Sequence, residues 1–94
     1  MTELKETTAL MESADYKERF KAEYYQTKIR YEKLKTFNTK IEAARTMEYR
    51  VGGMRICPMP EHDCPDGLLC EQQCVMQNYL HILEVRAAIE GIEL

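Results

Sequence analysis

The sequence predicts an all-α protein, an antiparallel two-helix hairpin with a long connection that contains prolines and cysteines. Two long stretches, 15–48 and 66–91, carry apolar residues at helical spacing. Between them, residues 49–65 contain two consecutive glycines and three prolines, which do not fit a helix interior. We therefore expect one small domain, residues 15–94, in which two helices pack side by side.

The first predicted helix, 15–48, carries its aromatic and apolar residues on one seam. The seam advances by alternating steps of four and three residues, the heptad pattern of helices that pack on another helix. Its members are Phe20, Tyr24, Thr27, Tyr31, Leu34, Asn38 and Ile41. At 1.5 Å per residue the helix is roughly 45 Å long, which is typical of a hairpin or coiled-coil arm. Asn38 either fixes the register of the seam or lies in water at the open end of the hairpin.

The second predicted helix, 66–91, carries two neighbouring apolar seams. The first consists of Met76, Leu80, Leu83 and Ala87, and the second of Val75, Tyr79, Ile82 and Ile89. Two seams need two neighbours, or one neighbour and a subunit contact. We therefore expect this helix to self-associate and the protein to be a homo-oligomer.

The segments outside the two helices are less regular. The connection, 49–65, is longer than an antiparallel turn requires. Asp63 or Cys64 is a candidate cap for the second helix, with Pro65 in its first turn and Asp66 near the positive end of its dipole. Residues 1–14 form an N-terminal extension, either a short helix of its own or a continuation of the next helix.

The charge is unevenly distributed, although the net charge is only −3. Residues 15–50 hold ten Lys or Arg against six acids, whereas residues 51–94 hold two against seven. Either the two helices attract each other, or the basic helix receives an anionic ligand or protein. The overall acidity argues against duplex DNA as a partner. No apolar run is long enough for a membrane span and there is no secretory signal, so we expect a cytoplasmic protein with reduced cysteines.

Four cysteines raise the question of a metal site: Cys57, Cys64, Cys70 and Cys74. Cys70 and Cys74 lie one helical turn apart and can share a metal, with further ligands arriving from the connection. The spacing lacks the C-x2-C knuckle of many zinc sites. Structural zinc, unliganded thiols and a disulfide are therefore all open, and no other cofactor is expected.

Aromatic and cationic side chains off the seam of the first helix are free to bind a ligand. Tyrosine rings stack on bases, and Arg and Lys bind phosphates. The candidate ligand-binding residues are Arg19, Tyr25, Arg30 and Lys33. The sequence contains no phosphate-cradling glycine loop, no paired-acid site and no nucleophile elbow, so it predicts no enzyme.

Three stretches resemble a family of small bacteriophage and prophage proteins that includes relatives of crAssphage accessory proteins. They are DYKERFKAEYYQTKIRYEKLK (15–35), CPDGLL (64–69) and QNYLHILEVRAAIEGIEL (77–94). The first fourteen residues and the cysteine-containing connection depart from the family, so no ligand of the connection is inherited from it. The resemblance implies a phage accessory protein in the cytoplasm of a host bacterium, and it implies no particular activity.

These observations favour a phage-encoded, non-enzymatic inhibitor of bacterial antiphage defence that acts by stoichiometric binding. The main hypothesis is that the basic, aromatic face of the first helix sequesters an anionic nucleotide immune signal. One alternative is protein–protein inhibition of a host defence protein, as anti-CRISPR proteins do. Another is a structural or regulatory phage protein that zinc stabilises.

Overall fold

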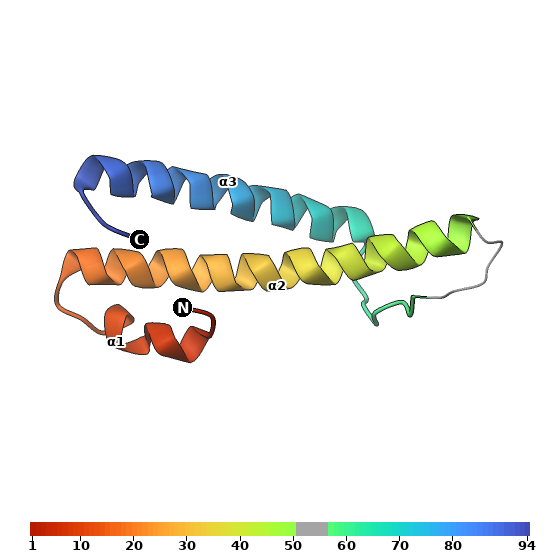
Figure 1. The fold of residues 1–94 in the computed structure, drawn as a ribbon, viewed down its shortest axis with the longest axis horizontal. Helices are drawn as coiled ribbons and strands as arrows, with labels where there is room; N and C mark the ends of the chain where they lie inside the picture. The colour runs from red at the N-terminus through yellow and green to blue at the C-terminus, as the bar shows by residue number, and fades with distance from the viewer. Residues whose placement is uncertain (51–56) are drawn as a thin grey trace.

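The computed structural model of the protein describes residues 1–50 and 57–94. In chain order the elements are the 3-10 helix η1 (Leu4–Thr7) and the α-helices α1 (Thr8–Met11), α2 (Tyr16–Arg50) and α3 (Asp66–Glu90). α3 packs along one side of α2, and α1 lies on the other (Figure 1). The all-α hairpin is confirmed. Gly52 and Gly53, on which the predicted break depends, lie outside the described residues.

α2 is long because nothing in its sequence interrupts it. Asp15 begins the helix, where its side-chain Oδ1 accepts a hydrogen bond of 3.0 Å from the backbone N–H of Lys17. Neither Gly nor Pro occurs between Tyr16 and Arg50. The helix extends beyond the first turn of α3 toward the connection (Figure 1). α2 therefore forms the scaffold on which every other element packs.

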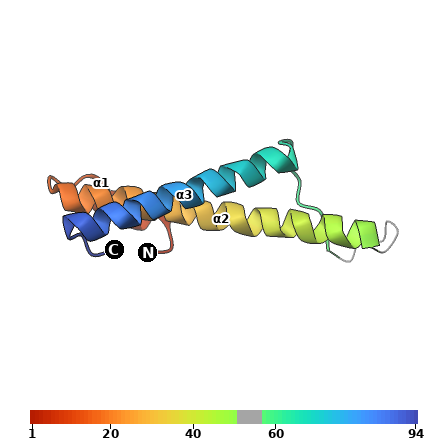
Figure 2. The same cartoon turned by 90° about the horizontal axis from the view of Figure 1, so that it is seen from above.

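The core between α2 and α3 lies at one end of the hairpin, where α2 begins and α3 ends. Its buried residues are Phe20, Tyr24, Leu80, Leu83, Ala87 and Ile92. The predicted seams supply all of them except Ile92. α3 runs antiparallel to α2 and crosses it at an angle (Figure 2). In the first half of α3, residues 66–79, no side chain is buried.

The chain end turns back onto this core through a glycine. Gly91 adopts the left-handed conformation, with φ 70°, which L side chains rarely adopt. The backbone N–H groups of Gly91 and Ile92 both donate to the carbonyl of Ala87, the second at 2.9 Å. This C-terminal cap directs the Ile92 side chain into the core, where it is buried.

Residues 1–14 fold back as a separate layer and do not continue α2. η1 and α1 contact α2 and not α3. Thr7, which is buried, donates to the carbonyl of Leu4 at 2.7 Å and accepts a hydrogen bond from Gln26 Nε2 at 3.0 Å. Ala22 and Ile29 lie four and three residues from Gln26 on the same face of α2, and both are buried. The N-terminal segment therefore covers a second apolar face of α2.

At the other end, where Ile41 and Ala44 of α2 are also buried, a polar bridge joins the two helices. The Asn38 side chain is 8% exposed, and its Nδ2 donates to the carbonyl of Leu69 at 3.1 Å and to Gln73 Oε1 at 2.8 Å. The alternative in which Asn38 lies in water is wrong. Both partners of the Asn38 amide lie on the same turn of α3. A shift of α3 along α2 would break both hydrogen bonds, so the amide favours a single register of the two helices.

The start of α3 differs from its predicted cap. Pro65 is the residue before the first helical turn, and no side chain caps the helix. Neither Asp63 nor Cys64 is the cap. Instead, the His62 ring lies edge-on to Phe37 of α2, with ring centroids 5.9 Å apart. The described part of the connection therefore packs back along α2, which explains why it is longer than a turn.

The second seam of α3 has no neighbour within the described chain. Val75, Ile82 and Ile89 are 59%, 54% and 78% exposed. Tyr79 is partly covered because its hydroxyl donates to Glu23 on α2. The expected second neighbour is therefore not another element of the described chain, since η1 and α1 pack on α2 alone.

Candidate ligand-binding groove

A groove follows one side of the α2–α3 pair and consists of two adjoining hollows. The first, of about 420 Å³, is lined by two tyrosines, a lysine, a histidine and side-chain amides. Tyr24 and Tyr31 come from α2, and His81 from α3. The Lys28 ammonium lies 5.9 Å from the centre of the Tyr24 ring, within cation–π range. Aromatic surface and positive charge therefore meet at this point.

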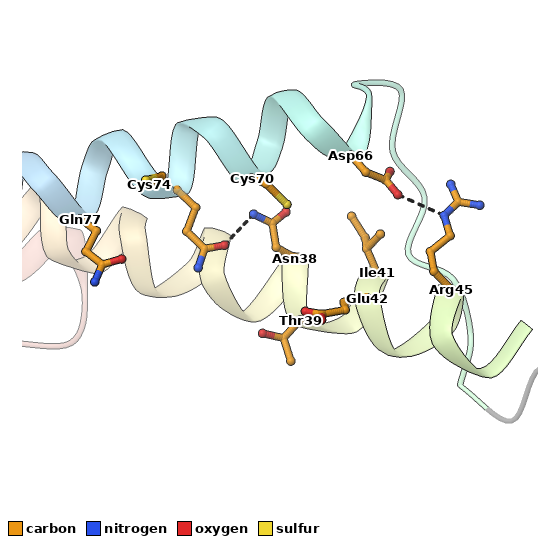
Figure 3. Close-up of a pocket in the computed structure, with 10 residues that line it drawn as sticks. Asn38, Thr39, Ile41, Glu42, Arg45, Asp66, Cys70, Cys74 and Gln77 are labelled. Atoms are coloured by element: carbon orange, nitrogen blue, oxygen red, sulfur yellow. Dashed lines mark hydrogen bonds and ion pairs between the residues drawn. The ribbon is translucent and has the colours of Figure 1, made fainter. Parts of the chain in front are cut away.

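The second hollow, of about 480 Å³, lies nearer the connection (Figure 3). Asn38 and Gln73 meet across it, and Arg45 Nε is 3.1 Å from Asp66 Oδ2 at its far end (Figure 3). Cys70 and Cys74 line the α3 wall. Side-chain amides both donate and accept, so this hollow is suited to the edges of bases and other mixed polar groups.

The two hollows adjoin at Gln77, which lines both, and we refer to them together as the groove. Each has a volume within the usual range of small-molecule sites. The helices position the groove because residues three and four apart share a face of α2, and Tyr24, Lys28 and Tyr31 have this spacing. The same helix presents its buried seam to α3, so the groove is the border between the core and the solvent-exposed face.

A row of lysines follows the α2 rim of this groove. Lys21 and Lys35 lie seven residues before and after Lys28, and Lys17 one turn before Lys21, so all four share one face of α2. None of the four forms an ion pair with the described residues. Glu32 and Glu84 also line the first hollow, and Glu42 the second, so the groove itself is of mixed charge. The rim offers positive charge that internal contacts do not neutralise.

One of the acids in the groove is already bound by a tyrosine. Tyr24 donates to Glu84 Oε2 at 2.7 Å, across the helix pair. Burial first, and then this hydrogen bond to a carboxylate, raise the pKa of Tyr24 to about 12. The phenol therefore stays protonated at neutral pH. Its hydrogen bond holds the Glu84 carboxylate toward α2.

A second polar cluster fixes the connection to the helices beside the groove. His62 Nδ1 and the Pro60 carbonyl are 2.8 Å apart, as are His62 Nε2 and Asp66 Oδ1. The hydrogen bond to the Pro60 carbonyl first, and the one to Asp66 second, raise the pKa of His62. The hydrogen bonds from His62 and Arg45 lower the pKa of Asp66. Protonated His62 donates from both ring nitrogens, so it joins the connection to α3.

We expect the docking of the connection to weaken as the pH rises. His62 has a higher pKa in the folded chain than the ordinary value of about 6.5. Its contribution to stability is therefore complete below about pH 6.5 and is lost as the pH rises through the folded pKa. An NMR titration of the His62 ring protons measures that pKa directly. Asp66→Asn should lower it toward the value in the urea-unfolded chain, and a native His62 that titrates at or below that value would contradict the expectation.

The structure places the four predicted ligand-binding residues away from this groove. Tyr25 is partly buried, with its ring edge-on to Tyr24 against the core. Arg19 donates to the Ser13 carbonyl at 2.9 Å. Arg30 and Lys33 are exposed. None of the four lines either hollow of the groove, and the structure does not bring them together into one site.

The four cysteines do not meet in one place. Cys64, Cys70 and Cys74 are exposed and Cys57 is partly buried, and all four are free thiols. Within residues 1–50 and 57–94, no three His, Cys, Asp or Glu side chains are arranged to hold a metal ion. The set Cys57, Cys64, Cys70 and Cys74 is therefore not assembled as a zinc site in this conformation.

The sequence interpretation missed the residues that line the groove. It assigned Tyr24 and Tyr31 to the seam that packs on the second helix. This assignment is right for Tyr24, which is buried, but Tyr24 also contributes surface to the first hollow. The steps of four and seven residues along the lysine row were the available signal, because they place Lys21, Lys28 and Lys35 on the same side.

The fold is that of a small all-α protein, a helical hairpin with aromatic, amide and cationic groups along one side. No helix in the described part of the chain has the length and apolarity to cross a membrane. The chain belongs to the Sequestin family, whose model matches residues 14–50 and 59–89. The family name is consistent with a protein that binds and sequesters a partner. Comparisons with curated proteins and with solved structures found no match.

Proposed function

We propose that this protein sequesters an anionic nucleotide signal in the groove between α2 and α3. The observation that carries the proposal is the meeting of tyrosine surface, side-chain amides and an unneutralised lysine row on one side of the hairpin. Tyrosine rings and amides suit a base, while ammonium groups suit phosphates. The match to the Sequestin family supports sequestration as the mode of action.

Binding without turnover is the expected chemistry of this groove. Glu84 accepts the Tyr24 hydroxyl, and Asp66 is paired with Arg45 and His62. These two acids are engaged in structural contacts, which supports a groove that binds its ligand and does not transform it. In a phage-infected bacterium such a protein would act in the host cytoplasm by lowering the free concentration of a defence signal.

Isothermal titration against cyclic dinucleotides, cyclic trinucleotides and cyclic ADP-ribose isomers tests the proposal. We expect heat of binding with at least one of them, and recovery of that nucleotide unchanged after the protein is heated. Lys28→Ala with Lys35→Ala should raise its Kd at least about 30-fold, because charge-assisted contacts to phosphate are lost. A converted product would contradict sequestration.

A matched control removes the same charge from another face of α2. Arg30→Ala with Lys33→Ala deletes two predicted contacts that the structure places outside the groove. We expect this pair to change the Kd less than about threefold. The opposite ranking would assign binding to the face of Arg19, Tyr25, Arg30 and Lys33. No binding to any nucleotide would instead favour inhibition of a defence protein.

A further inference from the structure

The exposed seam of α3 repeats every seven residues along the whole helix. We name it the outer seam: Leu68, Val75, Ile82 and Ile89, with Gln72, Tyr79 and Arg86 between them. Its steps of four and three residues are those of a helix packed against another helix. The four aliphatic side chains are all more than half exposed. A continuous apolar surface of this kind on a folded chain marks an interaction surface.

Two polar members of the outer seam, Tyr79 and Arg86, are already hydrogen-bonded within the chain. Tyr79 donates to Glu23 on α2. Arg86 Nη2 donates to the Tyr16 hydroxyl at 2.8 Å, and its Nε is 3.3 Å from Glu90 Oε2. The same guanidinium lies 5.1 Å from the centre of the Phe20 ring. These side chains are held in place before any partner arrives, so a partner helix does not leave them without hydrogen bonds.

The charges beside the seam favour one orientation of a second copy. Arg86, near the end of α3, is the only Lys or Arg in the helix, between Glu84 and Glu90, whereas Asp66 and Glu71 lie near the start of the helix. Two parallel copies would place Arg86 beside Arg86. Two antiparallel copies can be aligned in a register that places Leu68 opposite Ile89, Val75 opposite Ile82, and Glu71 opposite Arg86. In this register apolar residues face apolar residues and an acid faces a base, as a two-fold symmetric interface requires.

We propose that the outer seam binds the outer seam of a second copy of this chain, antiparallel, in that register. The interface uses a face of α3 other than the one that lines the groove, since Cys70, Cys74 and His81 line the groove and are not members of the seam. A dimer built in this way carries two grooves that both remain open to solvent. The proposal does not depend on which ligand the groove binds.

Sedimentation velocity from low-micromolar to near-millimolar protein tests the dimer. We expect a monomer–dimer equilibrium for the native chain, and an increase in the dimer Kd of at least about 100-fold for Ile82→Asp, because a buried charge lacks a partner. Ile82 is 54% exposed in the chain, so circular dichroism should report unchanged helix content. Ala88→Asp puts the same charge on an exposed position of α3 outside the seam and should leave the equilibrium unchanged.

The orientation is tested with one spin label per chain. Cys70, exposed near the start of α3, is labelled after Cys57, Cys64 and Cys74 are replaced by serine. The antiparallel register separates the two Cys70 positions by about 25 Å along the helix axis, whereas parallel pairing places them side by side. A native chain that stays monomeric, or a dimer that Ile82→Asp does not weaken, would overturn the proposal. A short distance between labels would overturn its antiparallel register.

Discussion

Replacing Leu83 with alanine should lower the free energy of unfolding by about 2–5 kcal/mol. Leu83 is fully buried at the centre of the core, with Phe20 and Tyr24 of α2 around it. Truncation removes apolar contacts and leaves a cavity that helices fixed by a heptad seam cannot easily close. A chain of this size has a total stability of roughly 5–14 kcal/mol, so the loss is a large share.

Urea denaturation at a fixed protein concentration measures this loss. The midpoint should fall while the slope stays the same, since the unfolded surface hardly changes. Leu94→Ala makes the same change at a position that is 40% exposed, and it should alter stability by less than about 0.5 kcal/mol. If the two variants were equally stable, the core would not lie where the structure places it.

Replacing Ile29 with alanine should cost about 2–4 kcal/mol and release the N-terminal segment. Ile29 is 5% exposed on the face of α2 that η1 and α1 cover, opposite the contact with α3. The segment is too short to be helical by itself, so its order depends on this packing. We expect faster amide hydrogen exchange over residues 4–11 in this variant.

Ile41→Ala is the matched control for that release. Ile41 is equally buried, at 4% exposure, but it lies near the connection and lines the second hollow. The variant should lose a similar amount of stability and keep the native exchange rates over residues 4–11. Loss of protection in both variants would mean that the N-terminal segment responds to global stability and not to its own contact with Ile29.

The hairpin could be predicted because its signals are local and repeated. Phe20 and Tyr24 on one helix and Leu80, Leu83 and Ala87 on the other lie at helical steps, and all five are buried. The prolines of residues 58–65 predict the non-helical connection that the structure shows over residues 57–65. Periodicity over several turns is a strong signal because apolar residues then recur on the same face of the helix in every turn.

The N-terminal layer and the groove could not be predicted in the same way. Four-residue helices carry no periodicity, and the contact of Thr7 with Gln26 joins positions nineteen residues apart. The groove depends on which levels of α2 and α3 face each other. The hydrogen bonds of Asn38 to Gln73 and Leu69 fix this register, and no sequence pattern predicts that Asn38 pairs with these two residues. The predicted ligand-binding residues were therefore selected for their residue types and not for their neighbours in space, and they lie outside the groove.

Because the clustered core lies at one end of the hairpin, the two ends should differ in local stability. All six residues of the α2–α3 cluster lie where α2 begins and α3 ends, while α3 buries no side chain over residues 66–79, which contact α2 partly through the Asn38 amide and Asp66. Local unfolding starts where buried apolar contacts are few, so we expect the two helices to separate first at the connection while their other end stays packed. The second hollow lies at the end near the connection. Its width can therefore adapt to a guest molecule without loss of the native fold.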